Sequence, residues 1–321
     1  MRLDNKNNVK YHIIDEGSEG QKIDNFLVKI LKDVPKSHIY KLLRSGQVRV
    51  NKKRIRTDFR LSINDSVRIP PVSYRERAKF VPTAANKSQI TDIEKDVLFE
   101  DDAFIVLNKL HGIAVHGGSG VNFGVIELLR QSRPNAKFLE LVHRIDKDTS
   151  GILLIAKKRL ALVGIHKQMR DKSIHKKYEA IVHGEWNKKQ LIVDLNLLKS
   201  SDVDGQKKIS VVDDSNNSVN TKKSRSVFFL KKNLKDFTFL EVKLITGRTH
   251  QIRVHLSHLG FPIVGDQKYG NFELNKRLRK IGLGRMFLHA SEVAFIHPIS
   301  MDKVHFLAPT PIEFNKINSL K

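Results

Sequence analysis

The sequence predicts an α+β protein with a mixed, largely antiparallel sheet and peripheral helices, preceded by a small N-terminal α/β domain. Strand-like runs such as "FIVLN", "GILLIA", "YEAIVHG" and "FTFLEVKLI" recur in the later part of the chain, with helical patterns between them and no regular βαβ repeat. The chain has 321 residues, 40% of them hydrophobic, which is enough for one large core and a second, smaller one.

Two short amphipathic helices are expected near the N-terminus. Apolar residues recur at helical spacing from Ile23 to Leu31 and again from Ile39 to Leu43, and Gly46 follows the second run. The stretch "QVRVN" then alternates as a strand does, and residues 61–70 favour another short strand with turn residues between the two.

The second helix and the following hairpin form a basic module. Residues 35–56 contain no aspartate or glutamate. The basic residues there are Lys36, Lys41, Arg44, Arg49, Lys52, Lys53, Arg54 and Arg56. Most charge runs form a solvated face, but charges of a single sign repel one another and are best explained by phosphate neutralisation. We therefore interpret this module as a contact surface for nucleic acid.

A linker separates this module from the rest of the chain. The segment "PPVSYRERAKFVPTAANKSQ" has no periodicity and carries three prolines. We expect an N-terminal domain at residues 1–72, a linker at 73–89 and a larger domain at 90–321. Within the larger domain, residues 121–131 and 159–170 favour helices, and the polar segment 200–226 is expected to be a solvent-exposed excursion.

Composition limits the classes of partner and of catalyst. The 58 Lys and Arg against 34 Asp and Glu give a formal charge of +24, which favours a polyanionic partner. No apolar run is long enough to span a membrane and the start has no signal-peptide core, so we expect a cytoplasmic protein. Without cysteine, the catalyst must be a carboxylate, hydroxyl, histidine, lysine or tyrosine.

A polar cluster stands directly before a buried strand. In "HRIDKDTSG", residues 143–151, a histidine, an arginine, two aspartates, a threonine and a serine precede the apolar run 152–156. A strand supplies rigidity and the loop before it supplies reach, so chemistry is commonly placed there. Taken alone, an aspartate at such a position is more often a turn or ion-pair residue. Asp146 is nevertheless the first catalytic candidate.

Two later segments share this polar signature. They are "KKYEAIVHG" at residues 176–184 and "TGRTHQIRVHLSHLGFPIVGDQKYG" at 246–270. In the second, Thr246 or Thr249 can cap a helix that runs to Gly260, with His250 and Arg253 one turn apart. Histidines of this helix do not make a zinc site by themselves, because no carboxylate or thiolate with matching spacing is nearby.

Together these segments resemble the successive motifs of pseudouridine synthases, which modify uridines in structured RNA. The motifs "HRIDKDTSG", "KKYEAIVHG", "TGRTHQIRVH", "GDQKYG" and "FLHA" carry the resemblance in the larger domain. The N-terminal segments "GQKIDNFL" and "PKSHIYKLLRSGQVRVNKKRI" resemble an S4-type RNA-binding domain. Two departures are visible: Leu110 stands where the family has proline, and Ile145 replaces a commoner leucine. Both are apolar, so they bear on loop stiffness more than on activity.

The resemblance implies roles for particular residues. Asp146 is the catalytic aspartate, Tyr178 packs on the target base, and Arg253 pairs with the catalytic carboxylate. Leu288 is an apolar wall of the pocket. The pocket is further expected to include Arg144, His143 and Thr149.

The implied reaction is the isomerisation of uridine to its C-glycoside, in 23S ribosomal RNA or a large-subunit precursor. The N1 bond to ribose breaks, the uracil rotates, and C5 rejoins the ribose, so the nucleotide must first be flipped out of its stack. The aspartate either attacks C1' or removes the C2' proton, and the sequence does not choose between them. No metal or cofactor is implied, and we expect a monomer.

Two alternatives remain from other classes of protein. One is a non-catalytic RNA-binding assembly factor that keeps the fold, against which the presence of all three candidate catalytic residues argues. The other is a metal-dependent nuclease, which would require clustered carboxylates.

Overall fold

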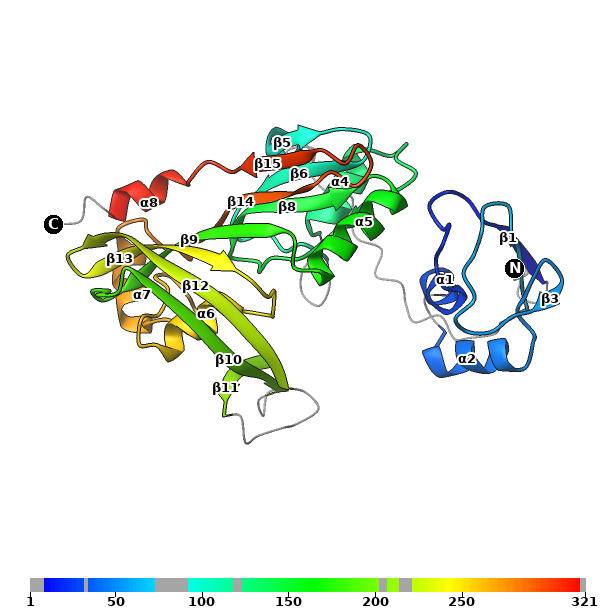
Figure 1. The fold of residues 1–321 in the computed structure, drawn as a ribbon, viewed down its shortest axis with the longest axis horizontal. Helices are drawn as coiled ribbons and strands as arrows, with labels where there is room; N and C mark the ends of the chain where they lie inside the picture. Colours follow the sequence, from blue (N-terminus) through cyan, green and yellow to red (C-terminus); the bar gives the residue numbers. More distant parts are fainter. Residues whose placement is uncertain are drawn as a thin grey trace, which may run out of the picture. The chain divides into compact units, whose positions relative to one another are not determined.

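The computed structural model describes residues 9–31, 34–72, 92–117, 123–201, 207–213 and 221–317. The chain divides into two compact units, Met1–Thr83 and Ala84–Lys321 (Figure 1). The expected linker at residues 73–89 lies outside the described residues, so its boundaries stay a prediction.

The N-terminal unit is a small antiparallel sheet packed against two helices. Its strands have the order β1 (Lys10–Ile13), β4 (Ser66–Ile69), β2 (Arg49–Val50) and β3 (Lys53–Arg54). Helices α1 (Ile23–Ile30) and α2 (Lys36–Arg44) bury their apolar faces in one core with the sheet. Strand β1 was not predicted, and the strand expected at 61–70 is confined to its second half.

The larger unit confirms the predicted mixed, largely antiparallel sheet. Its elements in chain order are β5 (Val97–Glu100), β6 (Phe104–Lys109), α4 (Val125–Ser132), β7 (Glu140–Leu141), β8 (Ser150–Ala156), α5 (Arg159–Arg170), β9 (His175–His183), β10 (Gln190–Ser201), β11 (Lys207–Val212), β12 (Thr221–Leu234), β13 (Phe237–Leu244), α6 (Gln251–His258), α7 (Phe272–Lys280), β14 (Leu288–Ile296), β15 (Lys303–Leu307) and α8 (Ile312–Ile317). The main strand order is β11-β10-β12-β13-β9-β14-β8-β6-β5, with β15 beside β14 and β7 beside β8. Among the described strands, only the β14–β8 pairing is parallel.

Helices cover both faces of the sheet around β6 and β8. Ile105 and Leu107 of β6 pack in a core with α4, whereas Phe104 and Val106 pack in a core with α5. Successive side chains of a strand point to opposite faces, so both faces of this part are buried. All seven residues of β8 are buried, which explains its unbroken apolar run.

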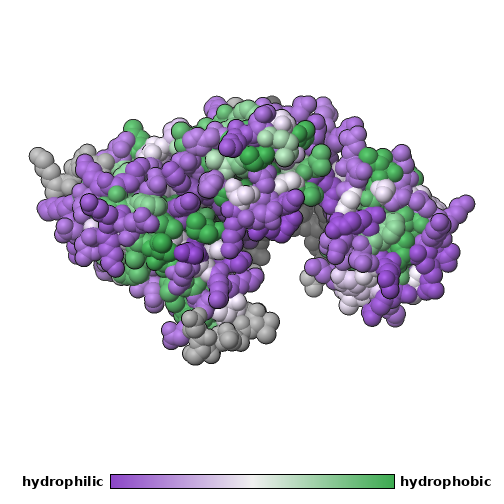
Figure 2. Space-filling view, in the orientation of Figure 1, coloured by the Kyte–Doolittle hydropathy of each residue, from purple (hydrophilic) through white to green (hydrophobic). Residues whose placement is uncertain are grey.

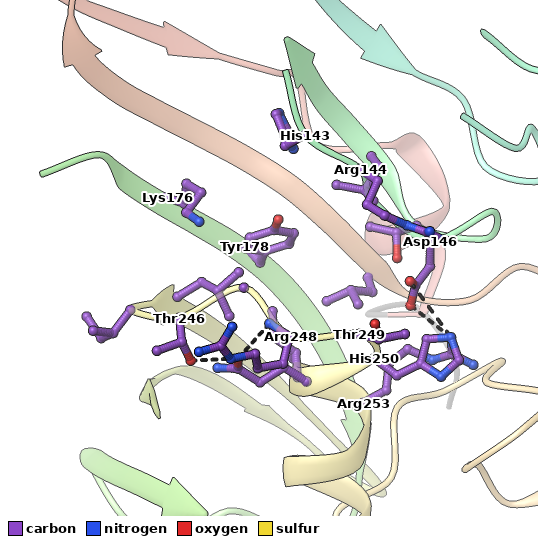
Figure 3. Close-up of a pocket in the computed structure, with 18 of the residues that line it drawn as sticks. His143, Arg144, Asp146, Lys176, Tyr178, Thr246, Arg248, Thr249, His250 and Arg253 are labelled. Atoms are coloured by element: carbon purple, nitrogen blue, oxygen red, sulfur yellow. Dashed lines mark hydrogen bonds and ion pairs between the residues drawn. The ribbon is translucent and has the colours of Figure 1, made fainter. Parts of the chain in front are cut away.

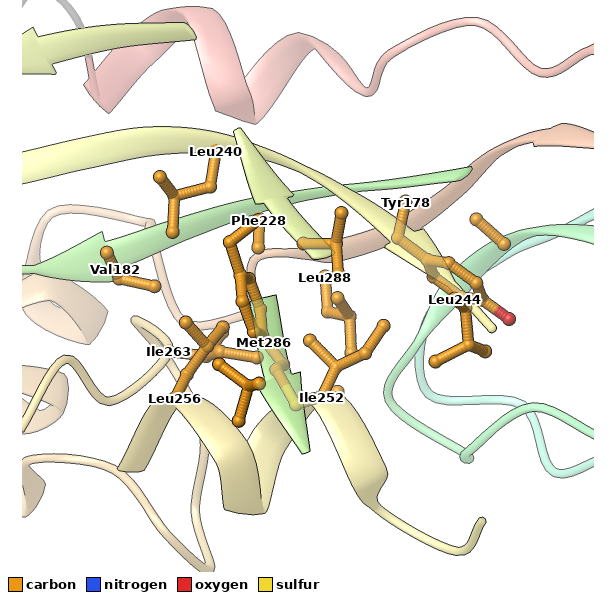
Figure 4. Packing of buried hydrophobic residues seen from close by; sticks show 14 of the residues in the cluster. Tyr178, Val182, Phe228, Leu240, Leu244, Ile252, Leu256, Ile263, Met286 and Leu288 are labelled. Carbon is orange, nitrogen blue, oxygen red and sulfur yellow. The ribbon is translucent and has the colours of Figure 1, made fainter. Parts of the chain in front are cut away.

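The other half of the sheet, β9 to β13, buries one face under α6. Tyr178 and Val182 of β9 share a core with Ile252 and Leu256 of α6 (Figure 4). The opposite face, which includes Ile181, packs in a separate core with α7 and α8. Tyr178 is therefore fixed on the same face of the sheet as helix α6.

The expectation for residues 200–226 is wrong for the parts that the structure describes. Strand β11 and the first half of β12 lie in this segment and extend the sheet. Ser224 is buried between the exposed residues Lys223 and Arg225, and Ser226 is buried two residues further on, in the alternation of a strand with one covered face. The Ser224 hydroxyl donates to the Leu195 carbonyl, which satisfies it inside the protein. The alternation could not be recognised in the sequence, because the buried positions of this strand segment are occupied by polar serines.

Strand β14 joins the two halves of the sheet, because it pairs with β9 on one side and with β8 on the other. At the parallel pairing, Gly151 has φ +102° and approaches the backbone of Ala290 closely.

The face drawn in Figure 2 is mainly hydrophilic, with apolar residues in smaller patches. Within the described ranges, no helix has the length and apolarity needed to cross a membrane.

Gly151→Ala is expected to lower the free energy of unfolding more than an ordinary strained glycine replacement does. A Cβ at residue 151 would lie 2.2 Å from the Ala290 carbonyl oxygen. Gly282 is the matched control, because its φ is +80° and its Cβ would meet nothing within 4 Å. Urea unfolding should show a loss of about 1 kcal/mol for Gly282→Ala from the φ penalty. Gly151→Ala should lose about 1 to 3 kcal/mol more from crowding, and equal losses would contradict this account.

Candidate active site

The polar loop before β8 is held from beneath by a buried lysine. Lys109, at the end of β6, donates from Nζ to the carbonyls of Leu110, Ile113 and Lys147 at 2.7 to 2.9 Å. Burial lowers the pKa of Lys109 to about 7, although the charges of Asp148 and then of Asp146 act in the opposite direction. Since Lys147 follows Asp146 directly, this contact fixes the backbone beside the candidate catalyst.

Arg253 lies between two carboxylates. Its Nη1 donates to Asp146 Oδ2 at 2.8 Å, while its Nε and Nη2 donate to the two oxygens of Asp266, each at 2.8 Å. Burial alone would lower the pKa of Arg253, but the hydrogen bonds and charges of Asp266 and Asp146 outweigh burial and raise it. The expected pairing of Arg253 with Asp146 is therefore present, and it rests on a second carboxylate.

Asp266 is fully buried and holds the arginine from behind. Its Oδ1 also accepts from the backbone N–H groups of Lys268 and Tyr269. Burial would raise the pKa of Asp266, but the hydrogen bond and charge of Arg253 and these backbone donors lower it. The motif "GDQKYG" contains Asp266, but its role was missed because sequence spacing does not show which carboxylate faces which arginine.

His250 precedes α6 in a left-handed conformation, φ 52° and ψ 19°. The prediction that Thr246 or Thr249 caps this helix is wrong. The N-cap position is His250, and Thr246 Oγ1 instead donates a hydrogen bond to Gln251 Oε1. His250 Nδ1 pairs with Tyr269 Oη at 2.9 Å, and Nε2 lies 3.9 Å from Asp146 Oδ1. Burial lowers the pKa of His250, which keeps the ring neutral at pH 7.

Tyr178 and Leu288 supply apolar walls. They lie on the paired strands β9 and β14, and Tyr178 is 7% exposed. Burial, and then the charge of Asp146, raises the pKa of the Tyr178 hydroxyl, so the phenol is protonated at neutral pH. Figure 3 shows the Tyr178 ring between Lys176 and Asp146 in that view of the pocket.

The residues expected around Asp146 line the same cavity, which has a volume of about 570 Å³. Thr149 is buried in its wall and Arg144 is exposed at its edge. His143 Nε2 accepts from the backbone N–H of Leu154 at 3.1 Å, which ties the loop to β8. Burial, followed by the charge of Lys176, lowers the pKa of His143 to about 3, so this ring is neutral.

The cavity is strongly basic. Its cationic residues are Arg144, Arg170, Lys172, Lys176, Arg248 and Arg253. Asp146 is the only carboxylate among its lining residues in the described part of the chain. A cavity of this volume can hold a group the size of a small molecule. The cations at its edge suit a polyanion to which that group is attached. Such a cavity can accept one nucleotide extruded from a nucleic acid.

The basic residues expected to contact RNA form no part of this cavity. All eight are exposed, as the charge pattern predicted, on α2, on the hairpin β2–β3 and beside them. Arg54 folds back over Gly46, and its Nη2 donates to the Arg44 carbonyl at 3.4 Å. The surface is therefore a local cluster of solvated cations within the N-terminal unit.

The helix that carries Arg253 shows no ligand set for a metal. His255 is buried, and its Nε2 pairs with Ser224 Oγ at 2.7 Å inside the core. In the described ranges, no group of three or more His, Asp or Glu side chains is placed to hold an ion.

Comparisons with known proteins show the family of the chain. A family model described as RNA pseudouridylate synthase matches residues 103–258, and an S4 domain model matches residues 21–67. The chain is 46% identical over 309 residues to ribosomal large subunit pseudouridine synthase C of Pasteurella multocida, covering 96% of this chain and 93% of the relative. The protein of the same name from Haemophilus influenzae is 47% identical over 300 residues, with 94% and 91% covered.

The fold also matches solved structures. Human RNA pseudouridylate synthase domain containing 4 superposes with a TM-score of 0.59 at 23% identity, covering 73% of this chain and 97% of that chain. Human RNA pseudouridylate synthase domain containing 1 gives 0.54 at 24% identity, over 67% and 82%. At these identities the likeness concerns the fold.

Asp266→Asn is expected to lower the free energy of unfolding at pH 7 by about 3 kcal/mol, because it leaves a buried guanidinium with one carboxylate fewer. The folded pKa of Asp266 lies below its ordinary value of 3.8. Its stabilisation is therefore complete above that value and is lost as the pH falls through the folded pKa. Urea unfolding at pH 7 and at pH 3 should show a smaller pH dependence for the variant than for the wild type.

Asp194→Asn is the control for this prediction. Asp194 pairs with Arg225 at 3.4 Å, but its side chain is 61% exposed. The loss there should be below about 1 kcal/mol. Equal losses at the two positions would contradict a structural role for the buried Asp266–Arg253 pair.

Proposed function

The chain belongs to the pseudouridine synthase family, and from that premise we propose that it isomerises uridines of large-subunit ribosomal RNA with Asp146 as the initiating group. The observation that supports this most is the placement of Asp146 as the one lining carboxylate, among described residues, of a basic cavity. Arg253 orients that carboxylate at 2.8 Å. A positioned carboxylate beside a pocket for one nucleotide is what the reaction requires.

Tyr178 forms the face on which the flipped uracil packs. A base taken out of its stack loses stacking energy, and an aromatic ring replaces about 1 to 3 kcal/mol of it. Leu288 on the neighbouring strand and Ile252 of α6 line the same cavity and exclude water from around the base. The protonated Tyr178 hydroxyl can also donate or pass a proton late in the reaction.

Asp146 starts the reaction by one of two routes. It attacks ribose C1' and displaces uracil, or it removes the C2' proton and uracil leaves as a double bond forms. In both routes the N1–C1' bond breaks and the uracil turns. C5 then bonds to C1' while the Asp146–C1' ester bond breaks in the first route, or while the C1'–C2' double bond is consumed and Asp146 returns the proton to C2' in the second. A proton finally leaves C5 and N1 gains one.

The N-terminal unit, which matches the S4 domain model, supplies affinity for RNA. Its exposed cations suit contacts to phosphates, which position an RNA without reading its sequence. We propose that 23S ribosomal RNA or a large-subunit precursor is the substrate and that the enzyme acts as a cytoplasmic monomer. All the chemistry is carried by side chains of the larger unit, without a metal or cofactor.

Asp146→Asn is expected to reduce isomerisation by a factor on the order of 10⁴ or more. The amide has nearly the shape of the carboxylate but can neither attack C1' nor remove a proton. Binding to RNA should survive, because the cationic surfaces are unchanged. Single-turnover pseudouridine formation on transcribed large-subunit ribosomal RNA, with binding assays alongside, measures both.

Asp148→Asn is the matched control, since Asp148 lies in the same loop but does not line the cavity. It should keep activity within a few-fold of the wild type. An Asp146→Asn enzyme that forms pseudouridine at a comparable rate would refute the assignment of Asp146.

Neutralising four exposed cations of the N-terminal unit is expected to weaken RNA binding without unfolding the protein. The variant carries Lys41→Gln, Arg44→Gln, Lys52→Gln and Lys53→Gln. Each lost phosphate contact should reduce the log–log salt slope of affinity by about 0.7 to 0.9. Binding titrations at several salt concentrations measure this, and slow isomerisation should persist.

A control of equal charge separates local contact from net charge. Lys276, Arg277, Arg279 and Lys280 are exposed on α7 in the larger unit. Their replacement by glutamine should change the salt slope less than the four changes in the N-terminal unit. Equal slopes for the two variants would place the RNA contact outside the N-terminal unit.

A further inference from the structure

Lys176 lines the cavity but has no role in the proposed reaction as far as Asp146, Tyr178 and Arg253 carry it. It lies on β9 two residues before Tyr178, and residues two apart on a strand point to the same face. Both side chains line the cavity, and Figure 3 shows Lys176 beyond Tyr178 from Asp146. A base packed on Tyr178 with its ribose at Asp146 therefore has its far edge toward Lys176.

The ammonium of Lys176 has no hydrogen bond or ion pair with any residue that the structure describes. Burial lowers its pKa, and no carboxylate acts against that effect. Glu292, on the adjacent strand, instead pairs with Lys177 at 3.2 Å and with His305 at 3.1 Å. A half-buried cation without a partner destabilises the folded protein, and such a cation is suited to bind an anion.

The reaction produces a negative charge at a defined place. Whether Asp146 attacks C1' or removes the C2' proton, its own negative charge is used up in the new bond. The electron pair of the N1–C1' bond leaves with uracil, which becomes a uracilate anion with its charge shared among N1, O2 and O4. Both routes thus move one negative charge from the carboxylate to the base.

We infer that Lys176 donates a hydrogen bond to the carbonyl oxygen at the far edge of the flipped uracil and stabilises the uracilate formed when the glycosidic bond breaks. This inference rests on the proposed function. The lysine keeps its proton throughout, so the step needs no additional reactant. A cation fixed where charge develops, in a pocket that excludes water, is among the strongest catalytic effects.

The symmetry of uracil lets one fixed donor serve the whole reaction. Rotation about the axis through N3 and C6 exchanges N1 with C5 and also exchanges O2 with O4. The oxygen at the far edge is O4 before the rotation and O2 after it. Lys176 therefore meets a carbonyl oxygen both when the first bond breaks and when the C5–C1' bond forms.

A phosphate is the competing ligand for Lys176. The exposed cations Arg144, Arg170 and Lys172 at the edge of the cavity are better placed for the RNA backbone, because phosphates stay solvated. Lys176 is more buried than these three residues and lies on the strand that carries the base-stacking ring. Depth in the cavity therefore favours the base over the backbone.

The test compares the full-length wild type with Lys176→Met and Lys176→Arg on transcribed large-subunit ribosomal RNA. Lys176→Met keeps the aliphatic stem and should lower the single-turnover rate by roughly 10²-fold. The dissociation constant for RNA and its salt slope should stay unchanged, and Lys176→Arg should recover part of the rate. Lys176→Met should unfold at the wild-type temperature or above it, because the charge it removes is unpaired.

Lys177→Met is the control on the opposite face of the same strand, where Lys177 pairs with Glu292 and Glu241. It should leave the rate within a few-fold of the wild type. An unchanged rate for Lys176→Met, confirmed with Lys176→Gln, would overturn the inference. Loss confined to affinity, with a smaller salt slope, would overturn it in favour of a phosphate contact. A wild type that forms no pseudouridine would instead refute the proposed function.

Discussion

The site depends on one guanidinium shared by two carboxylates. Arg253 gives two hydrogen bonds to buried Asp266 and one to Asp146, so its orientation is set before any substrate enters. One positive charge against two negative charges leaves the group with a net negative charge. If Asp146 were the only carboxylate beside Arg253, the pair would be neutral and would offer no net negative charge for the proposed chemistry. The fixed arginine in turn requires α6 to pack on the sheet through Ile252 and Leu256.

The loop that carries Asp146 has its own supports, independent of the arginine. Lys109 binds three backbone carbonyls beneath it, and the neutral ring of His143 accepts from Leu154 of β8. These are buried polar groups with satisfied partners, which stiffen a structure more than exposed ion pairs do. The cavity thus combines a rigid floor with an exposed cationic edge.

The sequence was sufficient for the fold class, most helices and the polar segments that surround the cavity. Apolar periodicity located α1, α2 and α5, and long motifs located Asp146, Tyr178 and Arg253, all of which line one cavity. The sequence did not identify side-chain partners that are brought together only by tertiary packing. Asp266 and Lys109 were not singled out, because only the folded chain brings their side chains to Arg253 and to the loop carbonyls. Strand β11 was missed because polar residues obscured its pattern.

The position of β14 has a consequence for how the enzyme matures. Asp146 lies in the loop before β8, in the half of the sheet built from β5 to β8. Tyr178 lies on β9 and Arg253 on α6, which packs on the half built from β9 to β13, and β14 joins the halves. The contact of Ser150 with His289 spans 139 residues. Such long-range pairing is slow to form, and it completes the cavity only when the last tenth of the chain is in place. During synthesis, a nascent chain that already contains every proposed catalytic residue therefore still lacks a working site.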